Sequence, residues 1–146
     1  MPMIDVYANE GTFADPNQLA ADLASTLLEV EHVPNLPMFR ENTAASIHAL
    51  PVGAISNVEG GGAYVRVPVL TNFGALDRDK QLAVVSRFTD LVASAAAAPE
   101  LRDRTWVLLT EAIDGGWGLW GHAHTNAELV AAARAEAARL SSSAEG

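Results

Sequence analysis

The sequence contains no cysteine, so neither a disulfide nor a thiolate metal site can hold the fold together. It also contains no apolar run long enough for a membrane span or for the core of a secretory signal peptide. Basic residues are scarce, because nine Lys and Arg stand against 18 Asp and Glu. The formal net charge of -9 repels nucleic-acid phosphates and anionic lipid. We therefore expect a cytoplasmic protein that binds neither nucleic acid nor membrane.

Apolar residues, by contrast, are abundant enough for one core. The chain has 146 residues, of which 49% are hydrophobic and only 18% are charged. At this length about two thirds of the surface of the unfolded chain can be buried without help from a metal or a disulfide. The whole chain, residues 1–146, is therefore expected to form a single domain.

The chain contains one structural unit twice, at an offset of about 62 residues. In each unit a short extended segment precedes a helix that begins after an aspartate, Asp15 in the first unit and Asp77 in the second. An aspartate there accepts hydrogen bonds from first-turn N–H groups, and Pro16 loses no hydrogen bond at the first helical position. A second extended segment follows each helix. The four expected strands are residues 2–8, 44–52, 64–71 and 105–112.

Both helices carry an apolar side that can pack on a sheet. In the first it comprises Leu19, Leu23, Leu27 and Val30, and in the second Val85, Phe88 and Val92. A right-handed helical crossover favours a parallel strand pair in each unit. We predict an α/β (α+β) fold in which the two units, about 2–56 and 63–121, form a four-stranded mixed sheet with two helices on one face.

Three further expectations concern the remainder of the chain. The glycine-rich segment 56–62 is a loop between the two units. An alanine-rich helix is expected over residues 127–140, within a C-terminal extension of 126–146 whose last six residues are frayed. Pro68 has no N–H to donate, so it is expected at a sheet edge or a strand end.

Two segments of this repeat resemble the tautomerase superfamily. The N-terminal MPMIDVY is similar to the start of its members, in which a proline follows the initiator methionine and begins the first strand. The run VLLTEAIDGGWGLWG, residues 107–121, resembles the second strand and glycine-rich hairpin of 4-oxalocrotonate tautomerase-like units. The doubled unit is similar to malonate semialdehyde decarboxylase, cis-3-chloroacrylic acid dehalogenase and macrophage migration inhibitory factor. The resemblance implies a homotrimer with active sites near the subunit interfaces.

The resemblance also implies that Pro2 is the catalytic group. A penultimate proline is small enough for methionine aminopeptidase, and removal of Met1 would expose a secondary amine. An α-amino group ordinarily has a pKa of about 7.7–8.0, and an apolar pocket lowers it further. A neutral Pro2 amine near pH 7 can move a proton next to a carbonyl or attack the carbonyl to form an iminium. The alternative is that Pro2 is the ordinary start of a strand.

The arginines with which relatives bind carboxylates are absent from the matching positions. Those positions hold Thr12 and Trp106, and none of the residues from Asn72 to Leu76, Ala75 included, is an arginine. Dehalogenation and decarboxylation are therefore not expected. Recognition of an acid requires another cation, for which Arg66 is the first choice and Arg40 the second, although a solvated surface role explains either arginine equally well.

Three further residues are candidates through the resemblance. Trp106 matches the tyrosine of the cytokine-type pocket and Trp117 the phenylalanine of the hairpin, so both are predicted to bind an apolar or aromatic substrate. Packing in the core or in a trimer interface is the alternative for each tryptophan. Glu41 matches the aspartate of the decarboxylase and is a second catalytic candidate that orients water or donates a proton. A solvated loop carboxylate is the alternative for Glu41.

His122 and His124 have the only spacing typical of metal ligands, but no third ligand accompanies them. We therefore expect neither a metal nor a cofactor. The function predicted first is a cofactor-independent tautomerase acting on a small keto–enol substrate. The alternatives are a noncatalytic trimer that binds a ligand or partner and a promiscuous hydratase that depends on Pro2.

Overall fold

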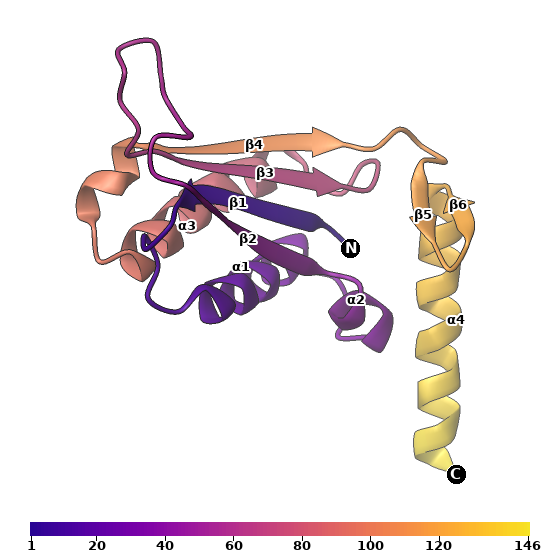
Figure 1. The fold of residues 1–146 in the computed structure, drawn as a ribbon. Coiled ribbons are helices and arrows are strands. Elements are labelled where there is room, and N and C mark those ends of the chain that lie inside the picture. The colour runs from indigo at the N-terminus through magenta and orange to yellow at the C-terminus, as the bar shows by residue number, and fades with distance from the viewer.

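The computed structural model describes residues 1–146 and confirms the predicted sheet and helices. The two units consist of β1 (Met3–Asn9), α1 (Pro16–Glu31), β2 (Ala44–Leu50), β3 (Val65–Thr71), α3 (Arg78–Ala95) and β4 (Thr105–Glu111). Their strands form one sheet in the order β2-β1-β3-β4, and α1 and α3 cover one of its faces (Figure 1). β1 is parallel to β2, β3 is parallel to β4, and the central pair of β1 and β3 is antiparallel. Each unit thus contributes one parallel pair to a mixed sheet.

Alternation along the strands supplies the core between the sheet and the helices. Every second residue of β1 and β3 is buried, and the buried side chains pack against the apolar sides of α1 and α3. The two helices begin as expected, because Asp15 accepts a hydrogen bond from the Gln18 N–H at 3.0 Å and Asp77 accepts one from the Lys80 N–H at 2.9 Å. The core includes Ile4, Val6, Leu19, Leu23, Leu27, Val65, Val67, Val69, Val84, Phe88 and Val92.

The other face of the sheet is not covered by any helix of the chain (Figure 1). Because side chains alternate, this open face carries the residues of each strand that point away from the core. Four of them are large, apolar and exposed, namely Met3, Leu70, Trp106 and Leu108. The open face is therefore an apolar surface of a kind that monomeric proteins seldom leave in contact with water.

The remaining elements are additions to the strand–helix–strand pattern of the two units. They are α2 (Pro37–Glu41), the 3₁₀ helix η1 (Pro99–Asp103), the two short strands β5 (Trp117–Leu119) and β6 (His122–His124), and α4 (Asn126–Glu145). β5 and β6 form a hairpin, and α4 follows it beyond the end of the sheet at which β4 terminates (Figure 1). None of the helices combines the length and apolar character that a membrane crossing requires.

The structure corrects three details of the sequence prediction. The last residues are helical up to Glu145 rather than frayed, since they contain no proline and no glycine before Gly146. Val84, not Val85, packs in the core, because the buried side of α3 continues through Phe88 and Val92 at helical spacing. Pro68 lies in the middle of an interior strand.

The interior position of Pro68 is accommodated by an interruption of the β1–β3 ladder. The paired positions of these strands are Met3 with Leu70, Ile4 with Val69, and Tyr7 with Arg66, so no pair is formed at Pro68. A proline that donates no hydrogen bond is thus tolerated without being placed at a sheet edge.

We expect the neighbouring valines of α3 to differ sharply in their effect on stability. Val84→Ala should lower the free energy of unfolding by about 2 kcal/mol, because it removes buried methyl groups and leaves a cavity. Val85→Ala should change it by about 0.5 kcal/mol or less, since Val85 is 38% exposed. Urea unfolding at one protein concentration measures both values. Equal losses would show that the orientation of α3 is wrong.

Candidate active site

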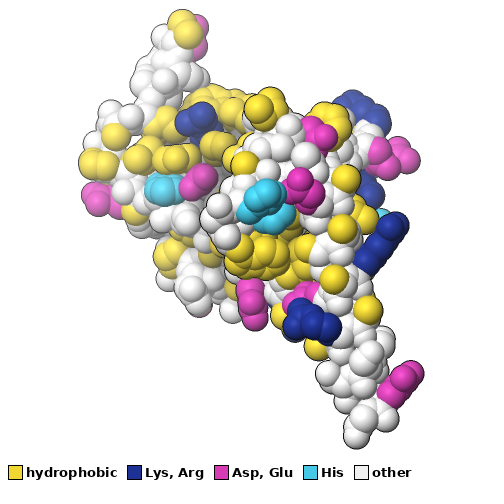
Figure 2. Space-filling view, turned by 90° about the vertical axis from the view of Figure 1, so that its right-hand side faces the viewer, with side chains coloured by type: hydrophobic (Ala, Val, Ile, Leu, Met, Phe, Trp, Pro, Cys, Tyr) yellow, Lys and Arg dark blue, Asp and Glu magenta, His cyan; other side chains and the backbone are white.

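The N terminus lies inside a cavity between the sheet and the C-terminal helix. Met1 is only 2% exposed, and it lines a cavity of about 360 Å³ together with residues from the end of α1, from α2 and from α4. In Figure 1 the N terminus emerges from the end of β1 that points toward α4. Apolar side chains gather on the surface along which α4 runs (Figure 2). The lining residues include Val33, Phe39, Leu129, Val130, Ala133, Arg134 and Ala137.

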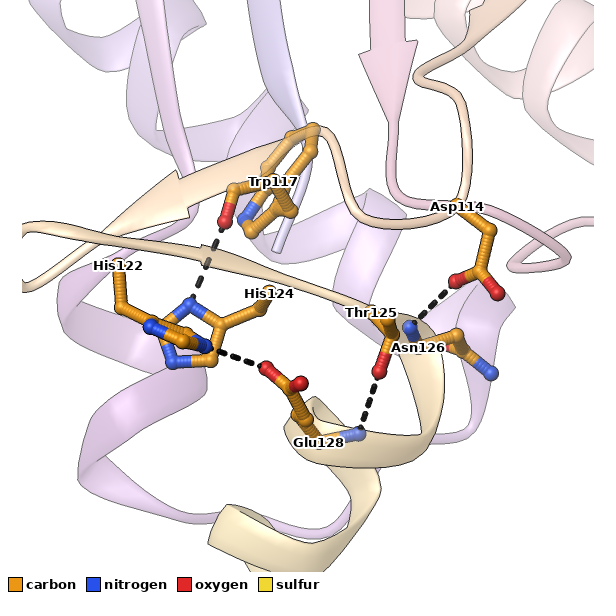
Figure 3. A network of polar contacts seen from close by, with 7 residues as sticks. All are labelled: Asp114, Trp117, His122, His124, Thr125, Asn126 and Glu128. Atoms are coloured by element: carbon orange, nitrogen blue, oxygen red, sulfur yellow. Dashed lines mark hydrogen bonds and ion pairs between the residues drawn. The ribbon is translucent and has the colours of Figure 1, made fainter.

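The C-terminal hairpin positions α4 as one wall of this cavity. Trp120 and Gly121 both have positive φ, at 54° and 74°, which is the conformation of a tight two-residue hairpin turn. The hairpin leads directly into α4, whose first turn is held by the Thr125 hydroxyl, which accepts a hydrogen bond from the Glu128 N–H at 3.1 Å. The Asp114 carboxylate accepts a further bond from the Asn126 N–H at 2.8 Å (Figure 3). These bonds satisfy N–H groups that a helix start leaves unpaired.

Three contacts then tie α4 to the rest of the domain. Leu129 and Ala133 of α4 pack with Met1 and Trp117 in a second apolar cluster, which is separate from the main core. The side chain of Asn126 accepts a hydrogen bond from Asn72 at 2.9 Å. The Glu136 carboxylate accepts a bond from the Met38 N–H of α2 at 3.1 Å.

The amino group of Met1 faces a buried carboxyl group. The Met1 nitrogen lies 3.8 Å from Oε2 of Glu31, the last residue of α1, and Glu31 is only 6% exposed. Burial lowers the pKa of the Met1 amino group, although the nearby Glu31 carboxyl opposes this shift. Burial likewise raises the pKa of Glu31, opposed by the Met1 amino group and by Lys80. The site therefore favours the uncharged forms of both groups.

Pro2 is also buried and immediately precedes β1. Its carbonyl oxygen accepts a hydrogen bond from the Ala44 N–H at 3.3 Å, so the first residues are held beside the start of β2. Removal of Met1 would place the new amino group of Pro2 where the chain enters the cavity. Pro2 itself is not among the cavity-lining residues, whereas Met1, which precedes it, lines the cavity beside Glu31.

Of the other predicted site residues, Trp117 shares an apolar cluster with Met1. It is buried and packs in the same cluster as Met1, but it does not line the cavity, so its position is that of the packing alternative. Glu41 is exposed at the end of α2 and is not among the cavity-lining residues. Arg40, the second choice for a carboxylate ligand, instead donates hydrogen bonds to the backbone and side-chain oxygens of Asn35.

Arg66 and Trp106 lie together on the open face of the sheet. Register places His48, Tyr7, Arg66 and Trp106 in one row across the four strands. His48 stacks on Tyr7 with a centroid distance of 4.4 Å, and the Arg66 guanidinium lies 5.6 Å from the centroid of the Tyr7 ring. Tyr7 is five positions from Pro2, which corresponds to about 17 Å along the strand. Within one chain these residues do not meet Pro2, so their predicted substrate contacts require a neighbouring subunit.

Two cavity residues were missed by the sequence argument. Arg134 is the only arginine or lysine that lines the cavity, and Glu31 is the only acidic residue that does so. The regular 3.6-residue spacing of α1 could have indicated that Glu31 follows Leu27 and Val30 on the buried side. No pattern in the sequence indicates that Arg134 of α4 lies near the N terminus.

The two hairpin histidines have protein partners. Nε2 of His122 lies 2.7 Å from Oε2 of Glu128, and Nδ1 of His124 lies 3.3 Å from the backbone oxygen of Trp117 (Figure 3). Their rings contact each other edge to face, with centroids 4.7 Å apart. No group of three or more His, Cys, Asp or Glu residues is arranged to hold a metal ion. These histidines therefore stabilise the hairpin and the start of α4.

No protein-family model matches the sequence, and no curated protein matches it. Solved structures do match. Native fused 4-OT has a TM-score of 0.70 and 16% identity, with 88% of this chain and 98% of that chain covered. A member of the cis-3-chloroacrylic acid dehalogenase family has a TM-score of 0.68 and 16% identity, with 88% of each chain covered. The chain has the tautomerase-superfamily fold. Pt0534, solved after inactivation by 2-oxo-3-pentynoate, also matches, with a TM-score of 0.67, 15% identity and coverage of 87% of this chain and 98% of that chain.

Within this tautomerase fold, we expect Glu31→Gln to stabilise the protein at neutral pH. The carboxyl group of Glu31 has a higher pKa in the folded protein than its ordinary value of 4.5, so it adds to stability at pH values below 4.5. This contribution is lost as the pH rises through the pKa of the folded state. The glutamine variant does not undergo this loss, so its advantage in urea midpoint should appear above pH 4.5 and increase toward pH 7. Glu29→Gln, at a side chain that is 63% exposed, is the control. A Glu31→Gln midpoint at or below that of the wild type at pH 7 would contradict the burial argument.

Proposed function

We propose that the protein is a cofactor-independent tautomerase in which the amine of Pro2, exposed by removal of Met1, is the general base. The observation that carries this proposal is the burial of the N terminus in an apolar cavity at the start of an interior strand. An amine in such surroundings loses hydration of its charged form, and its pKa falls toward neutrality. The uncharged amine can then abstract a proton from the carbon next to a carbonyl group.

The cavity also supports a substrate class. Its apolar lining includes Leu129, Val130, Ala133 and Ala137 of α4, together with Phe39 of α2 and Val33, which favours an apolar or aromatic body. Arg134 is the only cation among the lining residues and offers a partner for one carboxylate. We therefore propose a monocarboxylic keto acid with an apolar side chain. A second carboxylate would find no cation and would meet Glu31 instead.

A noncatalytic binding protein is the second candidate, and one observation favours it. The side chain of Met1 packs with Leu129 and Trp117, so a chain that keeps Met1 has its N-terminal proline blocked as an amide. Such a protein would retain the fold and the cavity but not the basic nitrogen. The state of the N terminus separates the two candidates.

We expect the purified protein to begin at Pro2 and to be labelled there by 2-oxo-3-pentynoate, the compound that inactivated Pt0534. Intact mass should lack one methionine and increase by one adduct, and peptide mapping should locate the adduct on Pro2. Pro2→Ala should lower kcat by at least about 10²-fold, the contribution typical of a general base. Retention of Met1 in all molecules, or full activity of Pro2→Ala, would exclude the catalytic proposal.

Phenylpyruvate should be turned over with a higher kcat/KM than 2-hydroxymuconate, because the cavity offers apolar contacts and only one cation. Arg134→Ala should raise KM for phenylpyruvate about 5-fold, as expected for an exposed charge pair of about 1 kcal/mol. Arg139→Ala, five residues further along α4 and outside the cavity, is the control. A preference for the dicarboxylate would contradict the proposed pocket. A KM effect at Arg66→Ala with none at Arg134→Ala would place the carboxylate on the open face of the sheet.

We also propose that the protein is a homotrimer. The open face carries exposed Met3, Leu70 and Leu108, and β2 and β4 leave unpaired strand edges. Two of the matching fused 4-OT structures are described as a symmetric and an asymmetric trimer. Association through this face would bring Trp106 and Arg66 of one subunit toward another.

Sedimentation should therefore show a trimer, which Leu70→Asp weakens by placing a charge in the interface. Leu82→Asp, at an exposed leucine on the helical layer, should leave the association unchanged. A wild-type protein that remains monomeric at all concentrations would rule out the trimer.

A further inference from the structure

Glu31 is the one carboxyl group that lines the cavity, and the fold leaves it poorly satisfied. Its Oε1 is buried without any hydrogen-bond partner, and its Oε2 has only the Met1 amino group at 3.8 Å. Lys80 donates to the backbone oxygen of Glu31, at 3.1 Å, rather than to its carboxyl group. A buried acceptor without a partner costs free energy, so the carboxyl group destabilises the fold where it stands.

The position of Glu31 on its helix is unfavourable for a negative charge as well. It is the last residue of α1, where the helix dipole presents its negative end, and His32 then leaves the helix with φ 57°. Burial, the unsatisfied oxygen and the helix dipole each make this carboxyl group unfavourable for stability. A chemical role therefore explains its presence better than a structural one.

We propose that Glu31 is a second catalytic residue, the general acid that works opposite the Pro2 amine. This inference rests on the proposed tautomerase function. Pro2 would act on the carbon next to the substrate carbonyl, and Glu31 would act on the carbonyl oxygen. The substrate would lie between the two groups, in the space that Met1 occupies and in the cavity beside it.

The distances permit this arrangement. The nitrogen atoms of consecutive residues are at most about 3.7 Å apart, so the Pro2 nitrogen lies at most about 7.5 Å from Oε2 of Glu31. An α-carbon and its carbonyl oxygen are about 2.4 Å apart, and each proton transfer needs about 2.6–3.2 Å between heavy atoms. An acid and a base that flank an enolising carbonyl are therefore up to about 8 Å apart, which accommodates the span available here.

The proton transfers balance without any further reactant. The neutral Pro2 amine takes a proton from the α-carbon, and the electron pair of that C–H bond forms the C=C bond of the enol. The electron pair of the C=O π bond moves to oxygen, which takes the proton from the Glu31 carboxyl group. Pro2 is then an ammonium and Glu31 a carboxylate, and transfer of one proton from Pro2 to Glu31 restores the starting state.

The charged groups around Glu31 are compatible with this cycle. The N-terminal amino group and Lys80 of α3 act on its carboxyl group, and His32 and Arg134 line the same cavity. Burial raises the pKa of Glu31 and lowers that of the amino group, which brings the two proton affinities closer together. A carboxylate on the substrate would lie toward Arg134 and away from Glu31.

The test is the pH dependence of phenylpyruvate turnover in protein whose mass confirms loss of Met1. The wild type should have a bell-shaped kcat profile, because turnover requires an unprotonated Pro2 and a protonated Glu31 at the same time. Glu31→Gln should lower kcat by about 10²-fold or more and remove the alkaline limb. Glu29→Gln, on the same helix and paired with Arg87 outside the cavity, should keep the wild-type profile. Full kcat and both limbs in Glu31→Gln would overturn the proposal.

A second measurement separates this inference from the proposed function. Titration of the ¹⁵N-labelled Pro2 amine by NMR requires no turnover and reports directly on its neighbours. Glu31→Gln should shift this titration to lower pH, because it removes an adjacent negative charge, whereas Glu29→Gln should not. If the wild type has no activity and the titration shifts, the tautomerase proposal fails and only the coupling of Glu31 to Pro2 stands. A titration unmoved by Glu31→Gln would overturn the pairing, whatever the activity.

Discussion

β1 is hydrogen-bonded on both sides, to β2 and to β3, and the geometry of the candidate site depends on this constraint. A strand in the interior of a sheet begins between its two neighbouring strands. Pro2 is therefore held between the start of β2 and the end of β3, where other segments cover it. The same constraint removes water from the N terminus, and loss of water is the largest influence on the pKa of its amino group.

The cavity around the N terminus is completed by a segment outside the repeat. The hairpin of β5 and β6 turns the chain back, and α4 then passes beside Met1 through Leu129 and Ala133. This wall is apolar except for Arg134 and the polar residues at its first turn. The repeat thus supplies the position of the amine, whereas the C-terminal extension supplies the surface that a substrate would contact.

The two faces of the sheet have different chemistry because side chains alternate along each strand. The inner face is filled by α1 and α3, whereas the outer face combines exposed apolar residues with the row of His48, Tyr7, Arg66 and Trp106. A partner subunit on the outer face would cover the apolar residues and bring the polar row near a second chain. Residues that are distant from Pro2 within one chain can enter a site only in this way.

The sequence by itself determined the repeat, the capped starts of α1 and α3, the parallel pairing of strands within each unit and the candidacy of Pro2. These features depend on local periodicity and on residue types whose preferences act over a few positions. The tertiary structure alone decided that Val84 rather than Val85 is buried, that Pro68 is tolerated within the sheet, and that Glu31 and Arg134 line the cavity at the N terminus. The reason is physical: Arg134 and Met1 are separated by nearly the whole chain, and their proximity results from the packing of α4 against the end of the sheet, which no local pattern records.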